Sequence, residues 1–404
     1  MSALIHALLM EMLKRRSRRT PRADRDLIVA PSEFGSVGDL AMVEGLHRLL
    51  AAAGRTPPLL AAIAHGEGWS GAGELHSPSE IPARASESFQ WFREDRGFSH
   101  VYLIGADVLD GAYSVRRSLQ RLRFCALSSA AGARVTITGC SFRTDPQPAI
   151  VRALRALPRE VRICARDPGS KRRLEDILGR EVEAVADLAF LVAPDPAGVV
   201  ARECLERLAE IRVSGRRIVA LCPNRSAVGL GSGTGSREER AMRCVDAFEQ
   251  VARAVLRMAP DAAFALMAHD SRGPFDDDAL CDMLHARLGD SVALRVASST
   301  RPSEIKAILS GCDALLTGRM HCGIAAIGAG TPAVFLDYQG KVEGLAALTD
   351  AARVVRFGGD RSTPPDDCAR LLIELTTPQA AWRTSAPAQL ARIEAMARAT
   401  IFPG

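Results

Sequence analysis

The sequence is poor in lysine: of 52 basic residues only Lys14, Lys171, Lys306 and Lys341 are lysine, and the rest are arginine. A GC-rich coding sequence accounts for this bias, so a lysine inside a functional motif is less expected by chance. Aromatic residues make up only 5% of the chain, which argues against the stacking platforms that bind single-stranded nucleic acid. The net charge of +5 is modest and spread along the chain, so no nucleic-acid partner is expected.

Long apolar runs are absent as well, and none reaches the roughly 18 residues of a transmembrane helix. The ten cysteines include no C-x-x-C pair, which excludes a zinc ribbon and a thioredoxin-type motif. Neither a disulfide-framework spacing nor a signal peptide is visible, so we expect a cytoplasmic protein. P-loop, H-E-x-x-H and G-x-S-x-G motifs are missing, and we expect neither a metal nor another cofactor.

The N-terminal segment combines a short apolar stretch, residues 4–13, with a cluster of basic residues from Lys14 to Arg25. A secretory signal would place its charges before the apolar stretch. Two interpretations stay open. The segment is a frayed helical extension with a solvated basic tail, or it contacts anionic lipid at the inner face of the plasma membrane, where each basic residue contributes about 1 kcal/mol.

Beyond residue 26, short apolar runs alternate with helical patterns, which is typical of parallel sheets covered by helices. The sequence predicts an α/β fold of two doubly wound, Rossmann-like domains that face a ligand-binding cleft, a GT-B-like architecture. We expect a basic extension over 1–25, an N-terminal domain over 26–195, a C-terminal domain with the donor site over 196–377, and a closing helix within 378–404 that packs back on the N-terminal domain.

The expected elements are read from these patterns. Strands are predicted at Leu27–Ala30, Leu59–Ile63, Val101–Ile104, Arg134–Thr138, Val161–Cys164, Val182–Val185, Arg217–Cys222, Ala262–Met267, Val292–Val296, Asp313–Leu316, Ala333–Leu336 and Val354–Arg356. Helices are predicted at Asp39–Ala53, Val115–Ala131, Gly169–Leu178, Arg237–Ala259 and within Pro378–Arg398.

The most informative stretch runs from Thr317 to Lys341. A strand ends before it, Gly318 makes a turn, and Arg319 and His321 open a helix of small residues. Backbone N–H groups at a helix N-terminus favour an anion, and a guanidinium and an imidazole beside them predict a phosphate or carboxylate site. Lys341 follows the next strand and is expected at the same edge. The alternative is a surface ion pair for Arg319 and a capping role for His321.

A second candidate lies after the first strand, in Gly35-Ser36-Val37-Gly38-Asp39. Two glycines allow a close approach of the backbone to a ligand. Asp39 stands at the start of a helix, where it is either a functional carboxylate or an N-cap.

Two further features have open interpretations. The glycine-rich segment 229–235 is a mobile surface loop or closes over a ligand. Asp276, Asp277 and Asp278 follow a proline at a helix start, where the helix dipole favours carboxylates. We prefer that structural interpretation to metal binding.

Together these motifs resemble the polysaccharide pyruvyl transferase family. That family carries an M-R-x-H-like element after a strand, an A-x-G-x-P helix end and then a lysine, which match Gly318 to His321, the segment through Pro332, and Lys341. Its Gly-Asn-x-Gly-Asp loop matches residues 35–39, with Ser36 in place of asparagine. Weaker similarities occur at residues 104–111, 166–170 and 267–270, where Asp107, Arg166 and His269 lie.

The resemblance implies transfer of a pyruvyl group from phosphoenolpyruvate, as co-substrate, to two hydroxyls of a sugar or lipid-linked oligosaccharide. It implies catalytic roles for His321 and Asp39. The implied donor-binding residues are Arg319, His321, Lys341, Arg166, Gly38 and Ser36, and the acceptor-binding candidates are His269, Asp270 and Asp107. A nucleotide-sugar glycosyltransferase and an inactive glycan-binding relative are the alternatives, and the acceptor and the oligomeric state stay open.

Overall fold

The computed structural model describes residues 10–13, 25–31, 35–62, 79–80, 98–227, 236–273, 276–337, 342–357, 362–377 and 379–401. The chain divides into two compact units. Unit 1 comprises Met1–Phe34, Met42–Leu191 and Ala395–Gly404, and unit 2 comprises Gly35–Ala41 and Val192–Glu394. The division therefore does not fall at one point of the sequence: a short segment after the first strand belongs to unit 2, and the C-terminus belongs to unit 1.

Unit 1 is built on a seven-stranded parallel sheet in the order β3-β2-β1-β4-β5-β6-β7. Its strands are β1 (Asp26–Val29), β2 (Leu59–Ala62), β3 (Ser79–Glu80), β4 (His100–Leu103), β5 (Arg134–Cys140), β6 (Arg162–Ala165) and β7 (Glu183–Ala184). The chain runs outward from β1 to β3 on one side and from β4 to β7 on the other. The strand order therefore reverses between β1 and β4, and ligands bind at the carboxyl ends of strands at such points.

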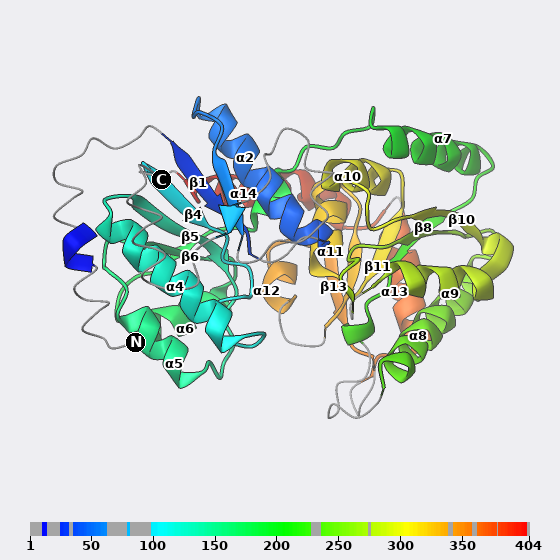
Figure 1. Ribbon diagram of the computed structural model, residues 1–404. Helices are drawn as coiled ribbons and strands as arrows, with labels where there is room; N and C mark the ends of the chain where they lie inside the picture. Colours follow the sequence, from blue (N-terminus) through cyan, green and yellow to red (C-terminus); the bar gives the residue numbers. More distant parts are fainter. Residues whose placement is uncertain are drawn as a thin grey trace. The chain divides into compact units, whose positions relative to one another are not determined.

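Helices α4 (Val115–Ala130), α5 (Pro148–Arg155) and α6 (Pro168–Leu178) cover one face of this sheet (Figure 1). They bury a large apolar cluster, in which alternate residues of β4 and β5, such as Val101, Leu103, Val135 and Ile137, point inward. Helix α2 (Val37–Ala52) connects β1 to β2, and the short 3-10 helix η2 (Leu188–Leu191) closes the unit.

Unit 2 contains a six-stranded parallel sheet in the order β10-β9-β8-β11-β12-β13. The strands are β8 (Ile218–Cys222), β9 (Ala263–Met267), β10 (Val292–Val296), β11 (Ala314–Thr317), β12 (Ala333–Leu336) and β13 (Ala352–Val355). Strands β8 and β9 are buried along their whole length, as expected for a sheet covered on both faces. Here the order reverses between β8 and β11.

Helices cover both faces of the second sheet (Figure 1). One face carries α7 (Val199–Val213), α10 (Pro302–Ser310) and α11 (Met320–Gly328), and the other carries α8 (Arg237–Met258), α9 (Asp278–Leu288) and α13 (Pro365–Thr376). The short turns η3 (Arg225–Ala227) and η5 (Gly289–Ser291), the short helix α12 (Glu343–Ala346) and the final helix α14 (Trp382–Arg398) complete the described elements.

The predicted α/β fold with two doubly wound sheets is confirmed. Ten of the twelve expected strands shift by a residue or two at an end, as is usual for such boundaries. The elements given no range in the prediction include helices α5, α7, α10 and α13 and the two-residue strand β3. All ten cysteines are free, and all except Cys204 are buried. No helix in the described part of the chain is long and apolar enough to cross a membrane.

Candidate functional site

The site begins where β11 passes into α11 in unit 2. Arg319 occupies the N-cap position, and its side chain makes no capping bond, so the first-turn N–H groups of α11 are not capped by it. Its main chain is fixed instead by Thr317, whose Oγ1 accepts a bond from the Arg319 N–H at 2.9 Å. Gly323 lets the helix pack closely on β12, because a Cβ there would lie 2.1 Å from the Phe335 ring. The expected helix N-terminus therefore stands where the sequence placed it.

Two buried carboxylates hold the Arg319 side chain. Asp277 accepts bonds from its Nε at 2.8 Å and from Nη2 at 2.7 Å, and Asp270 accepts one from Nη1 at 3.3 Å. Burial raises the pKa of the Asp277 carboxyl to about 6, against the opposing charge of Arg319. The open alternative of a surface ion pair for Arg319 is wrong, because both partners are buried. The geometry fixes the guanidinium in one orientation.

The segment 35–41 is part of the same unit and lies against His321. A Cβ on Gly38 would stand 2.4 Å from His321 Nδ1, so only glycine leaves room for that imidazole. Ser36 pairs with Asp270 in an isolated antiparallel bridge, and its Oγ accepts the Asp39 N–H at 3.3 Å. Ser36 therefore caps α2, and the alternative N-cap role for Asp39 is wrong.

Arg272 connects this segment to the carboxylates. Its Nε and Nη2 donate to the two oxygens of Asp270 at 2.9 and 2.6 Å, and Nη1 lies 3.5 Å from Asp39 Oδ2. Burial alone would lower the pKa of Arg272, but the bonds to Asp270 and the charge of Asp39 raise it. Asp39 is therefore held as the partner of a cation that sequence reasoning did not identify.

His269 lies at the carboxyl end of β9 and is buried. Neither ring nitrogen has a hydrogen-bond partner within the described ranges. Burial, together with the positive charges at Arg319 and His321, holds its pKa well below the usual range, so the ring is neutral. Its main-chain oxygen accepts the Val37 N–H at 3.1 Å, which joins β9 to the 35–41 segment. A neutral imidazole can donate one hydrogen bond and accept another, so it is suited to bind a hydroxyl group.

Two candidates, Arg166 and Asp107, belong to unit 1. Arg166 is buried, and it donates to Asp187 at 2.5 Å and to Ser141 Oγ at 2.9 Å, so much of its hydrogen-bonding capacity is used internally. Asp107 follows β4 at the point where the strand order reverses, and it accepts the Tyr113 hydroxyl at 2.8 Å. The preceding residue, Ala106, has a φ of 43°, a strained backbone that is often found at functional sites.

Asp277 and Arg272 are the residues that sequence reasoning missed. Asp277 was assigned with its neighbours to a helix start, and Asp276 does fill that role by accepting the Asp278 N–H at 3.0 Å. Asp277 instead faces Arg319, 42 positions away along the chain. One signal in the sequence could have identified Asp277: it follows β9 and its loop, at the same carboxyl edge of the sheet as Arg319.

Some candidates lie outside the described residues. These are Lys341, the glycine-rich segment 229–235, and residues 14–24 of the basic extension, whose contact with lipid stays a prediction. In the part of the chain that the structure describes, no group of three or more His, Cys, Asp and Glu side chains is arranged to hold a metal ion.

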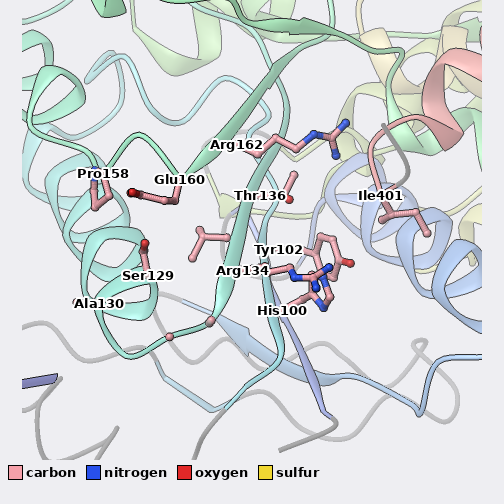
Figure 2. A pocket seen from close by; sticks show the side chains of 13 residues that line it. His100, Tyr102, Ser129, Ala130, Arg134, Thr136, Pro158, Glu160, Arg162 and Ile401 are labelled. Carbon is pink, nitrogen blue, oxygen red and sulfur yellow. The ribbon is translucent and has the colours of Figure 1, made fainter. Parts of the chain in front are cut away.

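A cavity of about 540 Å³ lies at the amino edge of the unit 1 sheet (Figure 2). Arg162 lines it, and this side chain donates to Glu183 and to the main-chain oxygens of Ala399 and Thr400. The contacts anchor the C-terminal residues to unit 1. Because ligands of doubly wound sheets bind at the carboxyl edge, we place the candidate site at the strand ends described above.

Solved structures with the same fold were found by comparison of the coordinates. A putative UDP-N-acetylglucosamine 2-epimerase from Listeria monocytogenes aligns with a TM-score of 0.58 and 11% identity, over 95% of this chain and 98% of that one. The Neisseria meningitidis UDP-N-acetylglucosamine 2-epimerase bound to its nucleotide sugar aligns with a TM-score of 0.57 and 11% identity, over 92% and 99%. Anabaena Alr3699/HepE in complex with UDP-glucose aligns with a TM-score of 0.53 and 12% identity, over 93% of this chain and 98% of that one.

At these identities the similarity concerns the fold alone, and it confirms the predicted GT-B-like α/β architecture. A search of curated proteins gives no match. The family model described as polysaccharide pyruvyl transferase matches residues 37–340, a range that includes every described residue of the site except Gly35 and Ser36.

Proposed function

Because the chain belongs to the polysaccharide pyruvyl transferase family, we propose that it transfers the pyruvyl group of phosphoenolpyruvate to two hydroxyls of a sugar acceptor. One observation carries the choice of donor: the α11 N-terminus, without a side-chain cap, lies beside Arg319 and His321 at the carboxyl end of β11. Such a place favours an anionic group. Phosphoenolpyruvate presents two of them, a phosphate and a carboxylate, which arginine binds with defined geometry.

The reaction balances without a further reactant. One acceptor proton moves to the methylene carbon of the enol, which becomes a methyl group, and C2 becomes electrophilic. Two C–O bonds form from C2 to the two acceptor oxygens, the bond from C2 to the phosphate oxygen breaks, and the second acceptor proton leaves with the phosphate.

The residues of unit 2 divide these tasks. Arg319, held by Asp277 and Asp270, and the N–H groups of α11 bind and stabilise the departing phosphate. His321 supplies a proton to it. His269 is neutral and buried, and its ring nitrogens, which have no hydrogen-bond partner among the described residues, are candidates to hydrogen-bond an acceptor hydroxyl. Asp39 is the second acid–base candidate, since its carboxylate lies at the start of α2 against Arg272.

The remaining roles follow the family resemblance. Lys341 supplies a further cation for the donor. The binding roles of Arg166 and Asp107, which belong to unit 1, stay predictions of the resemblance, as does acceptor binding by Asp270. Asp270 already accepts bonds from two arginines, so we expect it to act mainly by fixing them. Lys341→Arg tests whether charge alone suffices at that position.

The test is a screen of sugar acceptors with labelled phosphoenolpyruvate. We expect phosphate release together with a pyruvyl mass gain on one acceptor class. His321→Ala should lower kcat by about 10²–10⁴-fold, whereas His285→Ala, an exposed histidine on α9, should not. Consumption of a nucleotide sugar instead would favour the glycosyltransferase alternative. Stabilisation by phosphoenolpyruvate without turnover across the screen would favour an inactive glycan-binding relative.

A further inference from the structure

Arg225 lies across the second sheet's reversal point from Arg319. Strand β8 ends at Cys222, and η3 begins at Arg225. The turn is tied to the β11 loop, because Asn224 Nδ2 donates to the main-chain oxygen of Gly318 at 2.9 Å. Arg225 therefore stands at the carboxyl end of β8, next to the strand end that carries Arg319, and ligands of doubly wound sheets bind at this place.

The Arg225 side chain is buried without being satisfied. The residue is only 6% exposed, and its Nη2 has no hydrogen-bond partner in the described part of the chain. Leaving a buried charged donor unpaired is costly. Such groups are rare in native proteins, and a bound ion or an ordered water is among the ways in which they are satisfied.

Positive charge gathers around Arg225. Burial and the positive charges of Arg237, Arg240 and Arg319 lower its pKa, and Asp277 opposes them. The exposed carboxylate of Glu238 also interacts with Arg225. Asp277 is already engaged by two nitrogens of Arg319. Arg237 lies at the start of α8 and donates to the Gly273 oxygen at 2.6 Å, which brings it to the same strand ends. The guanidinium groups of Arg225 and Arg319 thus stand at neighbouring strand ends, an arrangement that favours a bound anion.

We infer that Arg225 is a phosphate-binding residue and that the phosphate lies between it and the N-terminus of α11. Phosphate fits better than carboxylate because it has enough oxygens and charge to bridge two strand ends. Its source, which rests on the proposed function, is the phosphate of phosphoenolpyruvate; inorganic phosphate and a phosphorylated acceptor offer the same chemistry.

The test uses the full chain with Arg225→Met, Arg225→Lys and the control Arg207→Gln, an exposed arginine on α7. Without phosphate, Arg225→Met should melt no lower than wild type, since it removes a buried unpaired charge. Titration with inorganic phosphate should show affinity at least about tenfold weaker in Arg225→Met, an intermediate value in Arg225→Lys and no change in Arg207→Gln. A lower melting temperature in Arg225→Met without phosphate, or phosphate affinity equal to wild type, would overturn the inference.

Competition separates the sources of the phosphate. If the donor supplies it, inorganic phosphate competes with phosphoenolpyruvate, and Arg225→Met raises the KM for phosphoenolpyruvate about tenfold. If the acceptor supplies it, phosphate binds together with phosphoenolpyruvate and the assignment to the donor is wrong. A wild-type protein that binds phosphate through Arg225 but never turns over phosphoenolpyruvate would contradict the proposed function and leave this inference standing.

Discussion

A single methyl group at Gly38 should disable the site by displacing His321. The Cβ of Gly38→Ala would lie 2.4 Å from Nδ1, 2.6 Å from Cγ and 2.8 Å from Cβ of the histidine, whereas ordinary contact begins at 3.4 Å. The imidazole must therefore retreat by about 1 Å. Unlike a surface side chain, it cannot simply swing away, because its ring and its Cβ are both in the path of the new methyl group.

The expected magnitudes follow from that displacement. Misplacing a catalytic group by about 1 Å costs on the order of 10²-fold in rate, and forcing an extra carbon into a packed position costs about 1–3 kcal/mol of stability. Steady-state pyruvyl transfer should show kcat/KM for phosphoenolpyruvate falling about a hundredfold, with a melting temperature only a few degrees lower. Gly273→Ala is the matched control, because a Cβ there meets nothing within 4 Å.

A double-mutant cycle tests the cause. If Gly38→Ala acts by moving His321, it should cost little further activity in a His321→Ala background. Full activity in Gly38→Ala would refute the reasoning, as would an equal loss in both backgrounds.

The other predictions concern the supports of the site. Burial raises the pKa of Asp277 to about 6, so its contribution to folding stability is present below about pH 4 and lost as the pH rises through 6, on the order of 2–3 kcal/mol. In thermal melts from pH 4 to 7, the melting temperature of the wild type should fall as the pH rises, and this fall should be smaller in Asp277→Asn. An equally large fall in Asp277→Asn would contradict the role of Asp277. Ser36→Ala should cost about 0.5–2 kcal/mol through loss of the α2 cap, and Ser36→Gly only a few tenths; chemical denaturation that ranks them the other way would exclude capping.

The strand pattern predicts most of the fold because each buried parallel strand is a short apolar run with its own boundaries. It also places Arg319 and His321 correctly, since a strand, a glycine turn and a small-residue helix are adjacent in sequence. Helix α5 was missed because Pro148–Arg155 is a short element of eight residues, close to the length at which periodicity carries little information.

The ion-pair partners of these residues could not be predicted from the sequence. Asp277 and Arg319 are 42 positions apart, and the sequence of Asp276 to Asp278 gives the same helix-start pattern whichever carboxylate turns inward. The chain itself determined the two doubly wound sheets, the position of the helix terminus at Arg319 and the family, because each depends on neighbouring residues. Only the tertiary structure decided that two buried carboxylates hold Arg319 and that Ser36 and not Asp39 caps α2. It also decided that Nη2 of Arg225 is buried with no hydrogen-bond partner among the described residues. These outcomes depend on which strand ends the sheet order brings together.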